Sequence, residues 1–143
     1  MNCALRLAIG LGAVAACGVA RAATLEVTVD GAEPGGGSVY VSLCRGGLSE
    51  TACGIGDSAP ARGGAQRFVF GDVEPGRYAV AAFQDLNANR RLDRTGLGLP
   101  LEPYAFSGET GRRARPDFAG ASFALREPGA AIRVRLARAL PAR

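Results

Sequence analysis

The sequence contains no histidine, no tryptophan and no lysine. Without histidine, the chain lacks the commonest base of acid–base catalysis and the residue that would complete a zinc site with two cysteines. Without tryptophan, and with only three tyrosines, it has few rings to line a sugar cleft. No serine lies in a nucleophile elbow. These absences argue against an enzyme and leave only the carboxylates of Asp85, Asp93 and Glu102 as candidate acids and bases for a hydrolase.

A strong charge imbalance is also missing. Setting aside Arg6 and Arg21 near the N-terminus leaves 15 arginines against 13 acidic residues, a net charge of +2. This excess is too small to indicate a nucleic-acid-binding protein. The densest basic cluster, Arg112, Arg113 and Arg115, lies in a loop bounded by glycine and proline. It is either a solvated loop or a contact surface for an envelope protein or an anionic surface.

The long apolar run of the chain, residues 7–20, is too short and too interrupted for a good membrane span. It follows a single basic residue and ends in Ala20-Arg21-Ala22, a small-x-small cleavage site. We therefore predict a secretory signal peptide over residues 1–22 and one periplasmic or secreted domain over residues 23–143.

A second cleavage site competes with the first. The stretch Val14-Ala15-Ala16-Cys17 resembles the lipobox of bacterial lipoproteins. Cleavage there would leave Cys17 at the N-terminus to carry lipid, and the domain would be anchored to a membrane.

Export determines how the cysteines are interpreted. Cys3 and Cys17 fall in the export segment, which leaves Cys44 and Cys53 in the folded domain. In an oxidising compartment such a pair predicts a structural disulfide that closes a small loop.

From residue 24 onward, short segments alternate apolar and polar residues and are separated by glycine and proline turns, a pattern typical of strands. Residues 77–83 are apolar on both faces, which predicts a strand in the middle of a sheet. No segment after residue 23 has a sustained helical period. We predict an all-β protein, an antiparallel β-sandwich of immunoglobulin or transthyretin type with six or seven strands and one long ordered loop. The expected strands include residues 24–30, 38–43, 67–70, 77–83, 121–126 and 131–138.

Side-chain oxygens recur at alternate positions after the central strand. Asp85, Asn87, Asn89 and Asp93 occupy positions 1, 3, 5 and 9 of an EF-hand-like count, with the Arg91 carbonyl at position 7. This pattern has two interpretations. It is either a weak calcium site or a loop of consecutive Asx turns, in which the side chains bond to their own backbone. Two departures weaken the calcium interpretation, because arginine replaces the glycine at position 6 and glycine replaces the glutamate at position 12.

Three segments in order carry a family resemblance: Gly76-Arg77-Tyr78-Ala79-Val80, then residues 85–93, then Gly98-Leu99-Pro100-Leu101-Glu102-Pro103-Tyr104-Ala105-Phe106-Ser107. Together they resemble the bacterial domain-of-unknown-function family 2141. The resemblance implies an exported β-sandwich without an established activity. This chain departs from the family pattern at Arg90, where the pattern has glycine.

Two functions fit these expectations. In a non-catalytic binding or assembly module of the envelope, the long loop presents Tyr104, Phe106 and the arginine cluster to a partner. In a purely structural accessory domain, Tyr104, Phe106 and Phe118 fold back to cover the open end of the sandwich. We expect the exposure of Tyr104 and Phe106 to separate the two functions.

Overall fold

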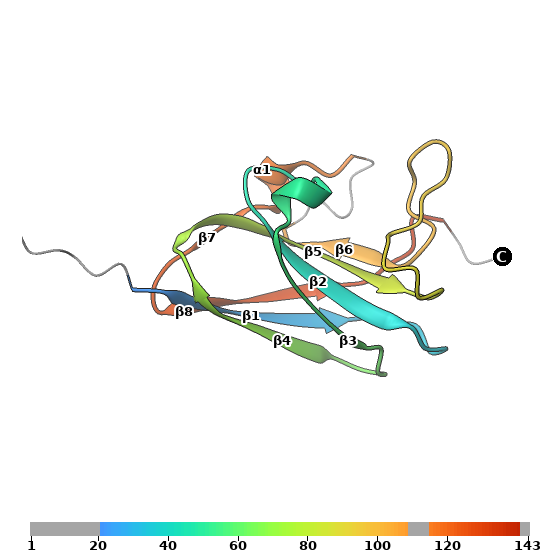
Figure 1. Ribbon diagram of the computed structural model, residues 1–143, viewed down its shortest axis with the longest axis horizontal. Helices are drawn as coiled ribbons and strands as arrows, with labels where there is room; N and C mark the ends of the chain where they lie inside the picture. Colours follow the sequence, from blue (N-terminus) through green and yellow to red (C-terminus); the bar gives the residue numbers. More distant parts are fainter. Residues whose placement is uncertain (1–20, 109–114, 141–143) are drawn as a thin grey trace, which may run out of the picture.

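The structure is a computed structural model and describes residues 21–108 and 115–140. These residues form two stacked β-sheets with very little helix (Figure 1), which confirms the all-β prediction. In chain order the elements are β1 (Ala23–Asp30), β2 (Ser38–Cys44), η1 (Glu50–Ala52), β3 (Ile55–Pro60), β4 (Gln66–Val73), β5 (Gly76–Asp85), β6 (Tyr104–Phe106), α1 (Phe118–Ala121), β7 (Phe123–Leu125) and β8 (Gly129–Arg135).

The sandwich consists of a three-stranded and a five-stranded sheet. The first has the order β4-β1-β8, and the second has the order β3-β2-β5-β6, with β7 also paired to β5. The sheets meet at one corner, where the backbone of Tyr104 in β6 exchanges two hydrogen bonds of 3.0 Å with Ala137, just after β8.

The core lies between the facing sides of the two sheets and follows the alternation of the strands. In β1, Leu25, Val27 and Val29 are almost completely buried, and the residues between them point to the outer face. β5 is central, as predicted, because β2 pairs with one side of it over residues 79–85 and β6 pairs with the other side over residues 81–83, while β7 pairs with residues 76–78. β5 ends at Asp85, the first residue of the long loop.

Two strands were not predicted, and they raise the number of strands from six to eight. β6 forms in the segment expected to be the long loop, and β3 forms in a segment expected to be a glycine-, alanine- and proline-rich connection. β3 is an edge strand of the five-stranded sheet, and nearly all of its side chains are exposed. A strand without a buried face has no apolar alternation, so its sequence carries little strand signal.

The end of the chain also differs from the expected antiparallel arrangement. β7 pairs with β5, whereas β8 runs parallel to β1 in the other sheet. The helix α1 precedes β7, and the side chain of Asp117 caps it by accepting a hydrogen bond of 2.6 Å from Gly120 N. Alternation shows which face a strand buries, but it does not identify the neighbouring strand. The parallel pairing of β8 with β1 could therefore not be predicted from it. Within the described ranges, no helix is long and apolar enough to span a membrane.

Candidate functional site

The loop that follows β5, residues 85–103, folds around the carboxylate of Asp85, and we call it the Asp85 loop. This residue is 1% exposed, and its two oxygens accept hydrogen bonds from the backbone N–H groups of Asn89 at 3.2 Å and Arg90 at 2.8 Å. A buried carboxylate is strongly destabilising unless it has such partners. Asp85 therefore fixes the first turn of the loop from inside.

Asn87, Asn89 and Asp93 close the same turn from outside. Asn87 Nδ2 donates to Asp93 at 2.6 Å, and Asn89 Nδ2 donates to both oxygens of Asp93 at 2.9 and 3.0 Å. Asn89 Oδ1 accepts from the backbone N–H of Arg91 at 2.9 Å. The structure thus brings together the residues expected to ligate calcium, but their polar groups bond to one another and to the backbone.

Calcium binding by these residues stays a prediction. A cation would need oxygens where the amides of Asn87 and Asn89 now direct N–H groups at Asp93, so both amides would have to rotate and lose these hydrogen bonds. Within the residues that the structure describes, no three histidine, cysteine, aspartate or glutamate side chains are grouped to hold a metal ion. The arrangement favours the alternative interpretation, a loop held by its own Asx turns.

Glu102 ties the far end of the loop to its beginning. Its side chain is buried, Oε1 accepts from Leu86 N at 2.9 Å, and Oε2 accepts from Asp93 N at 3.2 Å. Asp85 and Glu102, two of the three carboxylates considered as acids or bases, are therefore buried and bonded to backbone N–H groups.

The β1–β2 loop packs against the start of the Asp85 loop through Gln84, which is completely buried. Gln84 Oε1 accepts from Glu33 N at 2.7 Å, and Nε2 donates to the carbonyls of Glu33 and Gly36 at 3.0 and 2.9 Å. Gly37 has a φ of +75° and lies so close to the carbonyl of Asp85 that a Cβ there would collide with it.

An ion pair holds the segment after β8 to the β1–β2 loop and the Asp85 loop. Arg138 Nη2 donates to Glu33 Oε2 at 2.6 Å, and Arg138 Nη1 donates to the carbonyl of Leu101 at 3.1 Å. The hydrogen bond from Arg138 lowers the pKa of Glu33, and the same bond raises the pKa of Arg138. The β1–β2 loop, the Asp85 loop and the residues after β8 are thus fastened together at one end of the sandwich.

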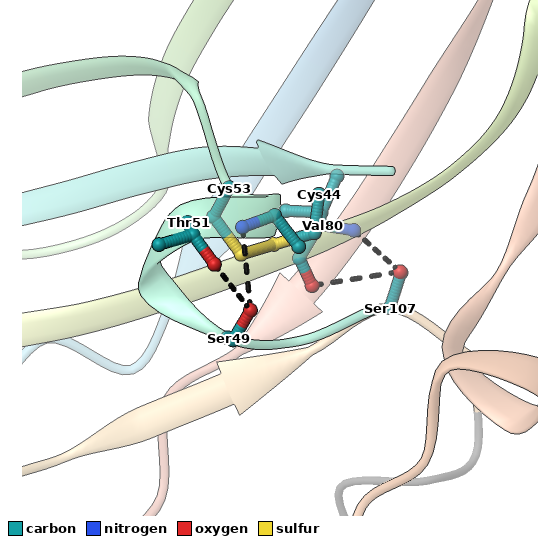
Figure 2. Close-up of a disulfide and its surroundings, with 7 residues drawn as sticks. Cys44, Ser49, Thr51, Cys53, Val80 and Ser107 are labelled. Atoms are coloured by element: carbon teal, nitrogen blue, oxygen red, sulfur yellow. Dashed lines mark hydrogen bonds between the residues drawn. A yellow bond between two sulfur atoms is a disulfide. The ribbon is translucent and has the colours of Figure 1, made fainter. Parts of the chain in front are cut away.

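A second loop is braced by the disulfide between Cys44 and Cys53, in agreement with the prediction. It contains η1, and we call residues 45–52 the disulfide loop. Within it, Ser49 Oγ accepts from Ala52 N at 3.3 Å and lies 3.0 Å from the hydroxyl of Thr51 (Figure 2). The loop therefore has a fixed shape on the outer side of the five-stranded sheet.

The disulfide belongs to a small second core on the outer face of this sheet. Ser107, which is 2% exposed, links that core to β5: its Oγ accepts from Val80 N at 2.8 Å (Figure 2) and donates to the carbonyl of Ala121 in α1 at 2.6 Å. The members of this core are the buried Cys44, Ala79 and Ala121 and the partly buried Leu48, Cys53, Ala81, Phe106 and Phe118.

Between the disulfide loop and the Asp85 loop, the outer face of the sheet is hollowed by a groove of about 280 Å³, which we call the aromatic groove. Tyr40, Phe83 and Tyr104 lie directly opposite one another on β2, β5 and β6 and form a row on its floor. The rings of Tyr40 and Phe83 stack, with centroids 5.1 Å apart, and Phe106 packs edge-on against Tyr104 at 6.0 Å. All four rings are half-buried.

The two loops form the walls of the aromatic groove. Leu48 of the disulfide loop and Cys53, which follows that loop, line one wall, and Leu92 of the Asp85 loop lines the other. A second hollow of about 230 Å³ shares Tyr104 and Phe106 with the groove and continues it past Leu99, Pro100 and Pro116. The site is therefore an elongated apolar depression with aromatic rings at its centre.

Arginines line one side of the aromatic groove. Arg90, Arg91 and Arg94 come from the Asp85 loop, and Glu50 faces the groove from the disulfide loop. Arg94 Nη1 donates to the carbonyl of Gly98 at 3.1 Å. Within residues 21–108 and 115–140, the guanidinium groups of Arg90 and Arg91 form neither an ion pair nor a hydrogen bond. The rim therefore has a local excess of positive charge.

Of the predicted contact residues, Tyr104 and Phe106 lie side by side in the aromatic groove, and Arg115 is exposed. The two rings are neither fully exposed nor buried, so exposure alone does not separate a binding module from an accessory domain. The other predicted features lie outside the described residues: Arg112, Arg113, Cys17 and residues 1–20 of the signal peptide predicted over residues 1–22.

Sequence reasoning missed Tyr40 and Phe83 as site residues. Each alternates with core residues in its strand, so its ring points to the outer face of the sheet. The signal that could have identified them was an aromatic residue at an outward position of a central strand.

The chain matches a family model for uncharacterised proteins conserved in bacteria, DUF2141, over residues 27–133. This range includes β2 to β7 and the whole aromatic groove. Searches of curated proteins and of solved structures found no match. Since the match spans most of the chain and agrees with the motif resemblance, the protein belongs to the bacterial family DUF2141.

Proposed function

We propose that this chain is an exported, non-catalytic binding module of the bacterial envelope and that the aromatic groove is its binding site. The observation that carries the proposal is the row of half-buried rings on the outer face of the five-stranded sheet, between two loops of fixed shape. Pockets that bind ligands are usually concave, largely apolar and preformed, with a few polar groups that set orientation.

The walls of the groove support binding more than a covering role. The disulfide braces one wall, and the buried carboxylates of Asp85 and Glu102 brace the other. Such preorganised walls lower the entropy lost when a ligand binds.

The lining indicates the chemistry of the ligand. Aromatic rings and leucines suit an apolar group, and the guanidinium groups of Arg90 and Arg91 suit a carboxylate, sulfonate or phosphate at its edge. The rings of Tyr40 and Phe83 stack on each other, so one face of each ring is already covered. This geometry suits an apolar side chain or ring better than the flat face of a sugar.

A non-catalytic role is supported by how the carboxylates are used. Asp85 and Glu102 bond to backbone N–H groups inside the loop, where they stabilise structure. Export is supported by the signal-like sequence of residues 1–22 and by the disulfide, since disulfides persist in oxidising compartments.

The experiment compares two fluorescent dyes, the anionic 8-anilinonaphthalene-1-sulfonate and the neutral N-phenyl-1-naphthylamine. We expect the anionic dye to bind the folded protein saturably and Phe106→Ser to weaken both dyes about tenfold. The double variant Arg90→Gln/Arg91→Gln should weaken the anionic dye alone.

Val69→Ser, on the outer face of the three-stranded sheet, is the matched control and should leave both affinities unchanged. Each variant is first checked for a cooperative thermal transition, since partly folded chains also bind such dyes. If Phe106→Ser leaves dye binding unchanged, the groove is not a site, and the alternative of a structural accessory domain, with or without a lipid anchor at Cys17, is favoured.

A further inference from the structure

The Asp85 loop contains a well-ordered hairpin at residues 93–101, which we call the leucine hairpin. Its arms are joined by backbone hydrogen bonds of 2.8 Å from Leu101 N to the carbonyl of Asp93 and from Thr95 N to the carbonyl of Leu99. Thr95 also closes the tip, because its carbonyl accepts from Gly98 N at 2.8 Å. The tip is therefore held in one shape.

This hairpin places leucine side chains in the solvent. Leu97 at its tip is 91% exposed, the highest value among the large apolar residues that the structure describes. Leu99 and Leu101 on the returning arm are 38% and 46% exposed. Single exposed leucines are ordinary, but Leu97 lies almost wholly in solvent at the end of a braced projection, and the partly exposed Leu99 and Leu101 extend this apolar surface along the returning arm.

Positive charge accompanies the leucines. Arg94 lies within the hairpin, where its guanidinium reaches the carbonyl of Gly98 at the tip, and Arg90 and Arg91 precede its first arm. The acidic residue of this segment, Asp93, is already engaged by the amides of two asparagines. An apolar tip with cationic residues beside it matches the order of layers at an anionic bilayer, with acyl chains inside and charged headgroups outside.

The shape of the tip favours a bilayer over a protein partner. Leu97 projects from a narrow turn, and a protein would need a pocket built to receive it, whereas a bilayer accepts any convex apolar tip. The hairpin rises on the same side of the molecule as η1 and α1, at the end opposite the start of β1 (Figure 1). Nothing in the described part of the fold covers it, so the tip can approach a flat surface.

We propose that the leucine hairpin is a membrane-contact element that inserts Leu97 into the surface of a bilayer rich in anionic phospholipid, with Arg94 and its neighbours at the headgroups. Contact is peripheral and reversible, because one side chain enters the acyl layer. The proposal does not depend on the aromatic groove: Phe106→Ser should leave vesicle binding unchanged even where it abolishes dye binding.

The absence of tryptophan from the chain allows a direct test. Leu97→Trp places a single tryptophan at the tip, and Val69→Trp places one at a control position that is 52% exposed on the outer face of the three-stranded sheet. The processed, exported chain is titrated with phosphatidylglycerol vesicles and with phosphatidylcholine vesicles. We expect a blue shift and protection from aqueous quencher for Leu97→Trp with phosphatidylglycerol alone, and no change for Val69→Trp.

Co-sedimentation with phosphatidylglycerol vesicles tests the chain without a reporter. Leu97→Ser should lower the partition coefficient about tenfold, Arg94→Gln should lower it severalfold, and high salt should lower it for every variant. Equal responses of the two tryptophans, or no response to either lipid, would overturn the proposal. A blue shift of Leu97→Trp that appears without vesicles, when the protein concentration alone is raised, would also overturn the proposal, since the tip would then contact a second copy of the chain.

Discussion

Glu33 and Arg138 lie 105 residues apart in the sequence and form two side-chain hydrogen bonds at the end of the sandwich where the Asp85 loop is anchored. The same guanidinium donates to the carbonyl of Leu101, at the end of the leucine hairpin. Gln84 holds the backbone of Glu33 from the other side. This ion pair therefore fastens the Asp85 loop and the residues after β8 to the β1–β2 loop.

Removing the carboxylate of Glu33 should destabilise the protein at neutral pH, and the effect should disappear in acid. Arg138 holds the pKa of Glu33 below its usual value of 4.5, so the pair contributes stability above that pH and loses it as the pH falls through the folded-state pKa. We expect Glu33→Gln to cost no more than about 1 kcal/mol at pH 7, because the glutamate side chain is 37% exposed and solvent screens the pair.

Thermal midpoints of the wild type and Glu33→Gln, measured from pH 7 to pH 3, check this expectation. The two curves should converge below pH 4.5. Glu26→Gln, which removes an exposed ion pair with Arg67 on the outer face of β1, is the control and should have a smaller effect at pH 7. A difference between wild type and Glu33→Gln that is constant across the range would contradict the assignment.

Arg90→Gly should stabilise the protein. Arg90 has a φ of +63°, a left-handed conformation that is strained for a side chain with a Cβ, and its N–H still bonds to Asp85. Relief of this strain should raise the free energy of unfolding by about 0.5–1 kcal/mol, less whatever entropy glycine adds to the unfolded chain. Denaturant unfolding measures the change, and Arg91→Gly, at a neighbour without a positive φ, should destabilise instead.

The parts of the fold that the sequence predicted are those governed by local alternation. Leu25, Val27 and Val29 share a buried face as expected, and the apolar character of residues 77–83 correctly placed that strand in the centre of its sheet. The number of cysteines and the expectation of export likewise predicted the disulfide. Each of these inferences requires only the pattern of apolar residues along one strand or the number of cysteines.

The missed features depend on partners distant in the sequence. Gln84 was not identified as an anchor, because the carbonyls that its amide bonds lie 48 and 51 residues away. The row across β2, β5 and β6 needs the register of three strands before Tyr40, Phe83 and Tyr104 can be recognised as neighbours. The parallel pairing of β8 with β1 has the same origin, since alternation does not encode the neighbouring strand.

The processed N-terminus distinguishes a free exported domain from a lipoprotein. Cleavage after Ala22 predicts a mature chain that begins at Ala23, the first residue of β1, whose side chain is completely buried. We expect intact-mass and N-terminal analysis of protein from a bacterial host to give this form. A mature chain that begins at a lipid-modified Cys17 would establish the lipoprotein instead, and Cys17→Ser should then move the protein from the membrane fraction to the periplasmic fraction.

Calcium should have little effect on the stability of the Asp85 loop. The oxygens of Asp85 and Asn89 already accept backbone hydrogen bonds, and the amides of Asn87 and Asn89 point their N–H groups at Asp93, so a cation would have to displace bonds that the loop already makes. Thermal unfolding with the disulfide intact, first in about 10 mM calcium and then in chelator, should give the same midpoint.

A site with a Kd of about 1 mM would instead add about 1.4 kcal/mol under these conditions, a shift of several degrees. Asp93→Asn keeps the shape of the side chain and removes its charge, so a calcium-dependent rise that this variant abolishes would establish the loop as a cation site.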